Sequence, residues 1–362
     1  QVFNLRSLFE VDWMLTFVAS VFVFGILIFF HELGHFTVAK FVGIKVHEFS
    51  LGFGPKLLTL PRGETSYILR IFPLGGFVRM AGMDPNEKDE EDDVRGFNSK
   101  TVGQRIAVIF AGPLMNFLLA VLLFSTIFIF QGIPVATTVI SEVIPDFPAA
   151  KSGIMAGDRI LAVDGQPVDS WEELSGLISQ KPEQEIEVTV LRDGVEKHFR
   201  VFTARDENNT GKLGIYPEQG LSKGNIFQAL ALGADYTARI TWMILDFVAK
   251  MILGQTPADV GGPVRVVSEI GKAAQVGFFF LLQLAAFLSI NLGLFNLFPI
   301  PALDGSRILF LFWEKVRGRP VDPVKENFIH LIGFGLLLLL IVIITYNDIL
   351  QVFLSGRMPT QR

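Results

Sequence analysis

The chain has 362 residues, of which 50% are hydrophobic and 19% charged, and its formal net charge is −5. A soluble domain is usually about 25% charged, so this composition indicates membrane-spanning segments. The acidic balance, without a basic stripe, argues against a nucleic-acid partner. The absence of cysteine excludes disulfides, thiolate zinc sites and cysteine nucleophiles.

Four apolar runs are long enough to span a membrane, since about 20 residues are needed to cross ~30 Å of hydrocarbon. They lie at about 13–36, 106–130, 276–298 and 328–350. The first run could instead be a signal peptide. However, no small-residue cleavage site follows it, and polar residues come directly after its apolar stretch, so we expect a retained span.

Lysine and arginine predict the orientation of these spans. The segment 40–105 contains ten of them and the short segment 315–325 contains four, whereas only Arg6 precedes the first span. The positive-inside rule therefore places both segments in the cytoplasm. We expect a multi-pass protein of the bacterial cytoplasmic (inner) membrane. Both termini and the large loop between the second and third spans would be extracytoplasmic.

Between the first two spans, the segment at about 45–82 consists of short β-like runs punctuated by Gly and Pro. This pattern predicts hairpins rather than a helix. The segment is unusually apolar for a soluble loop. We expect it to associate with the membrane domain, where irregular backbone must lie against protein or a wet cavity.

The large loop begins with strand-like alternation over 132–220, interrupted by a helical stretch. Within it, residues 148–168 resemble the signature of a bacterial PDZ domain, which holds an extended peptide as an added strand. A small β-sandwich of no particular type is the alternative. The chain has one such unit, not two.

Residues 221–275 follow, and they are predicted to form amphipathic helices on the membrane surface. Asp235, Arg239, Asp246 and Lys250 would form one narrow polar stripe on an otherwise apolar helix. The alternative is a fifth span. That span would move the C-terminus to the other side, against the distribution of basic residues.

The sequence HELGH, at 31–35, is the first feature that indicates chemistry. His31 and His35 are four residues apart, so on a helix they face the same way and can share one metal ion. Glu32 can reach a water molecule there as general base. Buried polar residues at the end of a span are costly and therefore usually functional. The metzincin extension is absent, because Val38 and Phe41 occupy its positions.

A zinc ion needs a third protein ligand, and Asp304 is the carboxylate that stands out. It directly follows the third span, on the same predicted side as the two histidines. Pro299 and Pro301 break the helix before it, and a broken helix inside protein is a common way to aim a ligand. The alternative is an aspartate that only closes the turn before Gly305.

The two motifs together, H-E-L-G-H and N-L-F-P-I-P-A-L-D-G, make the chain similar to the site-2 protease family of intramembrane zinc metalloproteases. The PDZ-like insert makes the chain resemble the bacterial RseP/RasP-type branch. The best-known enterobacterial members of that branch carry two PDZ domains, whereas this chain has one. The resemblance implies a Zn²⁺ cofactor bound by His31, His35 and Asp304, with Glu32 activating the water. The implied activity is regulated intramembrane proteolysis, the hydrolysis of peptide bonds inside transmembrane segments.

The resemblance also implies substrate contacts, because three further motifs match the family. These are AGPLMN at 111–116, N-x-x-P-x-P at 296–301, and PLGGFVRMAG at 73–82, a membrane-associated hairpin whose edge would pair with substrate. In the first motif Gly112 would permit close helix contact. The residues implied to bind substrate are Asn116, Asn296, Pro299, Pro301, Gly75, Gly76 and Phe77.

The implied partners are the lipid bilayer, single-span substrates such as anti-sigma factors and remnant signal peptides, and a peptide or C-terminus on the PDZ domain. Alternatives are a catalytically silent membrane chaperone, a PDZ scaffold with a membrane anchor, and a metal transporter. The intact HELGH motif and Asp304 argue against a silent protein. A scaffold would need only one span, and a transporter would usually need more polar residues along the spans.

The predicted fold is therefore an α-helical membrane protein with four transmembrane helices, a cytoplasmic membrane-associated β-hairpin region and an inserted extracytoplasmic α+β PDZ domain. The first half of the membrane domain would comprise 1–131 and the second half 276–362. The PDZ domain would comprise 132–220, and the amphipathic helices 221–275.

Overall fold

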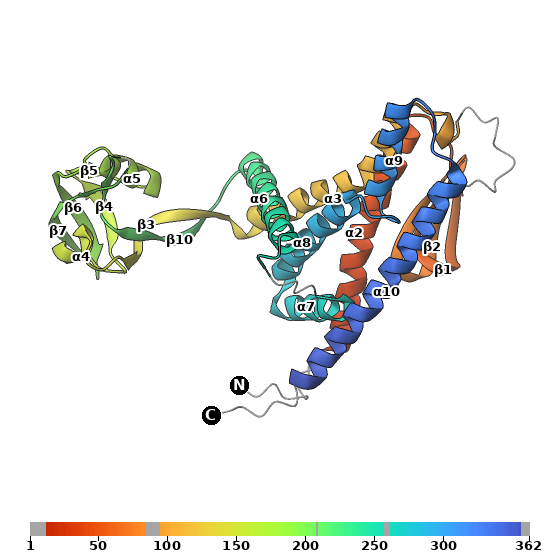
Figure 1. Ribbon diagram of the computed structural model, residues 1–362. Helices are drawn as coiled ribbons and strands as arrows, with labels where there is room; N and C mark the ends of the chain where they lie inside the picture. The colour runs from red at the N-terminus through yellow and green to blue at the C-terminus, as the bar shows by residue number, and fades with distance from the viewer. Residues whose placement is uncertain (1–11, 84–94, 208, 257–260, 356–362) are drawn as a thin grey trace. The chain divides into compact units, whose positions relative to one another are not determined.

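The computed structural model describes residues 12–83, 95–207, 209–256 and 261–355. Among these residues, four helices are long and apolar enough to cross a membrane, which confirms the four predicted spans (Figure 1). They are α2 (Trp13–Phe41), α3 (Val102–Gln131), α8 (Phe278–Leu297) and α10 (Pro323–Ser355). Packing divides the chain into two units. The membrane unit comprises Gln1–Ile127 with Ile226–Arg362, and the inserted unit comprises Phe128–Asn225.

Helix α2 is longer than the apolar run that predicted it. Asp12 caps its N-terminus by accepting hydrogen bonds from the backbone N–H groups of Met14 and Leu15. At the other end the helix continues through the HELGH motif to Phe41. The motif therefore lies on regular helix, so residues four apart face the same way.

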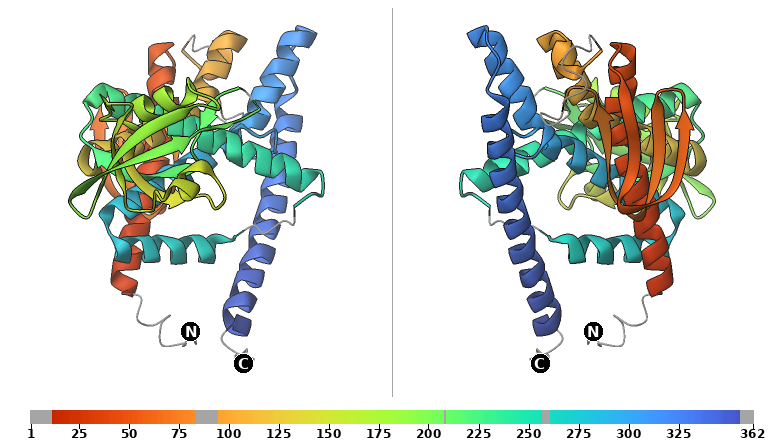
Figure 2. Two further views of the ribbon diagram at one scale, coloured as in Figure 1. Left: turned by 90° about the vertical axis from the view of Figure 1, so that its left-hand side faces the viewer. Right: turned by 90° about the vertical axis from the view of Figure 1, so that its right-hand side faces the viewer.

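The predicted hairpin is formed by β1 (Val46–Arg62) and β2 (Thr65–Met80), which pair antiparallel and pack against α2 (Figure 2). The near half of β1 pairs with both ends of β2, since Ser50 is opposite Phe77 on one side and Ile68 on the other. The rest of the hairpin exposes large apolar side chains on both strands, as expected of a membrane-associated hairpin. They include Phe53, Leu57, Leu58, Leu60, Leu69, Ile71 and Phe72.

The turn of this hairpin is tied to the neighbouring elements through Glu64. Its carboxylate accepts hydrogen bonds from Arg95 at 2.8 Å and from Lys40, near the end of α2, at 2.5 Å. These two cations lower the pKa of Glu64 to about 2. The Glu64 carboxylate is therefore ionised throughout the physiological pH range.

Three further helices belong to the membrane unit: α6 (Ile226–Ile252), α7 (Pro263–Val276) and α9 (Asp304–Arg317). The polar stripe predicted for α6 is present as two exposed ion pairs, Asp235–Arg239 and Asp246–Lys250. In Figure 2, α7 runs from the lower part of α2 toward α10. Its Gly271 lies against Thr16 of α2.

The inserted unit is a β-rich domain with a core of its own. Its main sheet has the order β10-β3-β4-β6-β7, with β5 paired to β4, and a small second sheet pairs β8 with β9. The strands are β3 (Ile133–Val143), β4 (Arg159–Val163), β5 (Gln166–Pro167), β6 (Glu185–Arg192), β7 (Val195–Phe202), β8 (Ala204–Arg205), β9 (Gly211–Lys212) and β10 (Ile215–Ser222). Helices α4 (Pro148–Ser152) and α5 (Trp171–Ser179) accompany them, so the predicted helical stretch is present.

Apolar side chains from alternate strand positions fill this core, including Ile160, Ile186 and Val188. Asp158 is almost fully buried beside them. Its carboxylate accepts hydrogen bonds from the Arg192 guanidinium at 2.6 and 2.7 Å and from the Met155 backbone N–H. Burial opposes ionisation, but these bonds prevail and hold the pKa of Asp158 below its ordinary value.

Candidate metal centre

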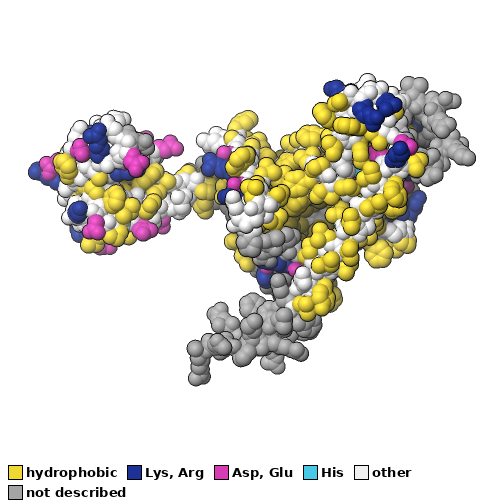
Figure 3. Space-filling view, viewed as in Figure 1, with side chains coloured by type: hydrophobic (Ala, Val, Ile, Leu, Met, Phe, Trp, Pro, Cys, Tyr) yellow, Lys and Arg dark blue, Asp and Glu magenta, His cyan; other side chains and the backbone are white. Residues whose placement is uncertain are grey.

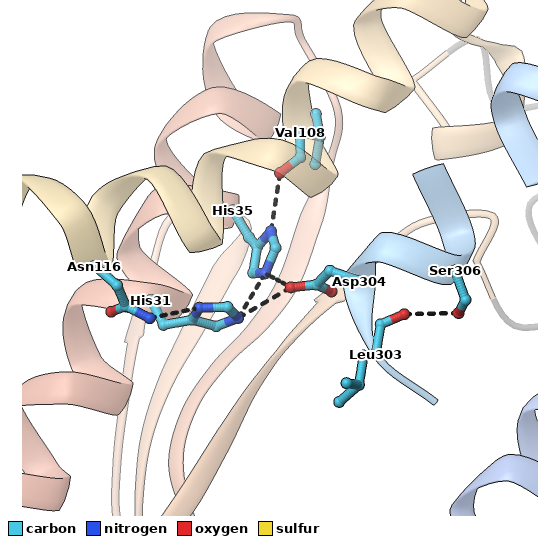
Figure 4. A network of polar contacts seen from close by, with 7 residues as sticks. All are labelled: His31, His35, Val108, Asn116, Leu303, Asp304 and Ser306. Carbon is cyan, nitrogen blue, oxygen red and sulfur yellow. Dashed lines mark hydrogen bonds and ion pairs between the residues drawn. The ribbon is translucent and has the colours of Figure 1, made fainter. Parts of the chain in front are cut away.

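Three side chains from two distant parts of the chain converge in the membrane unit. His31 and His35 face the same way from α2, and Asp304 is the first residue of α9 (Figure 4). The two Nε2 atoms lie 3.2 Å apart. Asp304 Oδ2 lies 3.2 Å from His31 Nε2 and 3.4 Å from His35 Nε2.

The spacing of these three atoms fits a zinc ion. Tetrahedral ligands at the usual zinc distances of about 2.0–2.1 Å are separated from one another by about 3.3–3.4 Å. Asp304 Oδ2 is buried and has no hydrogen-bond partner among the described residues. A buried carboxylate oxygen facing two imidazole nitrogens without a hydrogen bond is the arrangement expected where a cation belongs.

A backbone carbonyl sets the tautomer of His35. Its Nδ1 lies 2.9 Å from the carbonyl oxygen of Val108 on α3, so Nδ1–H donates to that oxygen and Nε2 keeps its lone pair. The same neighbouring helix approaches the ring closely. A Cβ placed on Gly112 would lie 2.3 Å from His35 Nε2, so only glycine fits against the ring at that position.

Asn116 lies behind His31. Its side chain is fully buried, and its amide Nδ2 lies 3.1 Å from His31 Nδ1, while its Oδ1 has no hydrogen-bond partner among the described residues. Ser289 of α8 donates to the Asn116 backbone carbonyl at 2.8 Å, which fixes α3 against α8. Asn116 therefore contacts a candidate metal ligand directly.

Helix α9, which presents Asp304, is held in place by polar contacts. The hydroxyl of Ser306 donates to the Leu303 carbonyl at 2.7 Å and closes the turn that begins the helix. Farther along, Glu314 forms a largely buried ion pair with Arg105 at the start of α3. The helix is thus fixed to the helix that supports His35 and His31.

A cavity of about 550 Å³ lies beside the three converging side chains. Of the residues predicted for the site, His31, Glu32, His35, Gly76, Phe77 and Asp304 line it. The described residues on its wall do not include Gly75, Asn116, Asn296, Pro299 or Pro301. The lining residues that the sequence analysis did not identify are Val78, Arg79, Met80, Met83, Ile109, Ala302, Arg307 and Asn327.

Of these additional residues, Arg307 could have been predicted from the sequence, because it follows Asp304 by three residues on the same helix and so lies on the same face.

The edge of the β-sheet also reaches the cavity. Gly76 makes this approach possible, since a Cβ there would lie 3.0 Å from Glu32 Cγ and 2.9 Å from the Ser50 carbonyl oxygen. The candidate base therefore lies beside the backbone of a strand.

Comparison with known proteins gives matches over almost the entire chain. The model of peptidase family M50 matches residues 19–340. The zinc metalloprotease RasP of Bacillus licheniformis is 34% identical, with 94% of this chain and 100% of that protein covered. The regulator of sigma-W protease RasP of Bacillus subtilis is also 34% identical, with 94% and 99% covered.

Two further matches are another curated relative and a solved structure. A putative zinc metalloprotease of Clostridium acetobutylicum is 35% identical, with 92% of this chain and 96% of that protein covered. Among solved structures, the PDZ domain of an SdrC-like protein from Listeria innocua is 28% identical with a TM-score of 0.21. That match covers 23% of this chain and 93% of that chain.

Proposed function

The chain belongs to peptidase family M50 and is a zinc metalloprotease of regulated intramembrane proteolysis, and from this premise we propose a role for each residue of the site. His31, His35 and Asp304 hold the zinc ion, and Glu32 is the general base. The observation that carries this assignment is the convergence of three ligand atoms beside a carboxylate-lined cavity. The cavity lies among helices that are apolar enough to span a membrane.

Zinc, when bound, supplies a Lewis acid that polarises the substrate carbonyl and makes water more acidic. Glu32 accepts the proton of the attacking water and returns it to the leaving amine. The Val108 carbonyl keeps the His35 proton on Nδ1, so Nε2 faces the metal. The contact with Val108 holds the His35 ring before substrate arrives, which limits the reorganisation needed during the reaction.

We propose that Asn116 performs the same task for His31, in addition to the substrate contact that the resemblance implies. The amide nitrogen faces His31 Nδ1, and the unpartnered amide oxygen is on the opposite side. Rotating the amide by 180° would let Oδ1 accept a hydrogen bond from Nδ1–H. That orientation leaves the Nε2 lone pair of His31 for the metal ion.

The substrate must lose its helical hydrogen bonds before its carbonyls can be reached, because each is bonded to an N–H four residues away. The strand edge at Gly76 and Phe77 borders the cavity and could hold the unwound segment as an added strand. Asn296, Pro299 and Pro301 precede Asp304 in the chain, and we propose that they contact the substrate where it enters.

The substrates that we propose are single-span membrane proteins, including anti-sigma factors and remnant signal peptides. A name given to one relative, regulator of sigma-W protease, supports this class. The inserted unit would act as a PDZ domain that binds a peptide or C-terminus. Its paired strands and accompanying helices offer the strand edge and helix that such binding needs.

Reconstituted protein provides the test of this function. In proteoliposomes that contain only this protein and a single-span reporter, we expect two reporter fragments to accumulate. A membrane-permeable zinc chelator should stop the reaction because the Lewis acid is lost, and added zinc should restore it. Cleavage that continues at the same rate after chelation, with zinc shown to be removed, contradicts the proposal.

The proposed orientation places the inserted unit outside the cytoplasm and the loop between α9 and α10 inside it. Because the chain contains no cysteine, one introduced thiol reports on one position only. A membrane-impermeant maleimide should label a Glu196→Cys variant in intact cells. It should label an Arg319→Cys variant only after the membrane is opened. The reverse pattern would show that the orientation is wrong.

A further inference from the structure

The turn that leads into Asp304 has an unusual backbone. Helix α8 ends at Leu297, and residues 298–303 connect it to α9. In this connection Ala302 has φ +79°, a left-handed conformation that residues other than glycine rarely adopt. Such a conformation persists only where surrounding contacts impose it. The contacts that hold Ala302 therefore also fix the position of Asp304, two residues later.

One of these contacts comes from α10. The backbone N–H of Ala302 donates to Nδ1 of His330 at 3.0 Å. Because Nδ1 accepts this bond, the ring proton is on Nε2, which is buried and lies 3.7 Å from Glu326 Oε1. The ring also packs edge-on against Phe310 of α9. His330 is thus fixed between the turn and the helix that begins with Asp304.

A second contact lies one helical turn farther along α10. A Cβ on Gly333 would lie 2.3 Å from Pro301 Cβ and 2.7 Å from the Pro301 carbonyl oxygen, so α10 and the turn touch there directly. One turn in the other direction, Asn327 lines the cavity. Residues 327, 330 and 333 follow one another at a spacing of three, so a single face of α10 meets both the cavity and the turn.

The rest of α10 has few such contacts. Large apolar side chains such as Leu336, Leu339 and Val342 are exposed along it, and hydrophobic side chains cover its visible face (Figure 3). Near its far end, Asp348 accepts hydrogen bonds from the backbone N–H groups of Gly262 and Arg265 at the start of α7. The helix is therefore held at two separate places, with a stretch of exposed apolar side chains between them.

We propose that His330 is a positioning residue for the metal centre, and that with Gly333 it imposes the strained turn that presents Asp304. This inference rests on the proposed role of Asp304 as a zinc ligand. His330 does not touch the metal ion or the substrate. It acts through the backbone of Ala302, so the last span contributes to zinc binding without providing a ligand.

Two pairs of variants in the full-length protein test this role. Gly333→Ala places a methyl group against Pro301, whereas Gly335→Ala on the same helix meets open space and serves as its control. His330→Leu removes the acceptor for Ala302 N–H. His330→Asn is the conservative counterpart, because its amide oxygen can take the place of Nδ1 as acceptor.

The readouts are the rate at which zinc passes to a chromogenic chelator and the visible spectrum of the cobalt-substituted protein, which reports ligand geometry. We expect Gly333→Ala and His330→Leu to release zinc about tenfold or more faster, the size typical for loss of a group that supports a metal ligand. Both should also alter the cobalt spectrum. Gly335→Ala should match wild type, and His330→Asn should recover most of the retention lost in His330→Leu.

Two results would overturn the inference: equal zinc release from Gly333→Ala and Gly335→Ala, or equal loss in the Leu and Asn variants of His330. If His330→Leu fails to fold, the comparison of Gly333→Ala with Gly335→Ala still tests the inference. Failure of the proposed function itself has a different signature. In that case wild-type protein would bind no stoichiometric zinc, or would keep it when His31 and His35 are both replaced.

Discussion

Glu32→Gln should abolish cleavage of a membrane-embedded reporter while zinc content stays at the wild-type level. Glutamine has nearly the same shape as glutamate but cannot accept the proton of the attacking water, so the base is lost and the ligands remain. General acid–base catalysis contributes roughly 10²–10⁴-fold, and we expect a fall of at least about that lower limit. The measurement compares initial cleavage rates in proteoliposomes with metal analysis of the same preparations.

Glu269→Gln is the matched control, because Glu269 lies exposed on α7 and pairs with Lys272, away from the cavity lining. Its cleavage rate should equal that of wild type. Equal rates for Glu32→Gln and wild type would remove Glu32 from the mechanism. Loss of zinc from Glu32→Gln would instead mean that this carboxylate takes part in holding the metal ion.

Asp304→Ala should empty the metal centre. The change removes one of three ligand atoms and the only carboxylate among them, leaving two imidazoles whose Nε2 atoms lie 3.2 Å apart. We expect zinc affinity to fall by more than the ~10–100-fold that follows loss of a supporting partner. Cleavage should disappear with the metal and return in part when zinc is added in excess. Zinc affinity is measured by competition with a chelator of known strength.

Asp235→Ala provides the comparison for this experiment, since Asp235 lies exposed on α6, where it pairs with Arg239. It should bind zinc as wild type does. An Asp304→Ala protein that keeps its zinc at wild-type affinity would show that the third ligand is another residue. The close packing of His31, His35 and Asp304 would then need a different explanation, such as a charged hydrogen-bonded cluster.

Much of this architecture can be predicted from local patterns of the sequence. Long apolar runs predict spanning helices because a helix satisfies all its backbone groups within one segment, and all four runs are helices. The spacing of His31 and His35 predicts a shared face wherever the helix is regular. Asp304 could be identified because prolines stop α8 just before it, so the chain must turn there.

Other parts of the site have no local signature. Val108 contributes a backbone carbonyl, which any residue could supply, and it is 73 positions away from His35. The motif around Asn116 predicts a substrate contact, whereas its position behind His31 depends on how α2 and α3 pack. His330 belongs to no motif in the sequence, and its contact with Ala302 depends on how α10 docks. Such pairings are decided by tertiary packing, which residue spacing does not encode.

The central claim is that this metal centre hydrolyses peptide bonds inside a transmembrane segment, and the new ends of the cleaved reporter test it most directly. Mass spectrometry of fragments made by wild-type protein in proteoliposomes locates the bond that was cut, with Glu32→Gln as the blank. We expect new termini within the apolar span of the reporter that are absent from the blank. Cleavage confined to residues outside the span, or the same fragments from the blank, would contradict this claim.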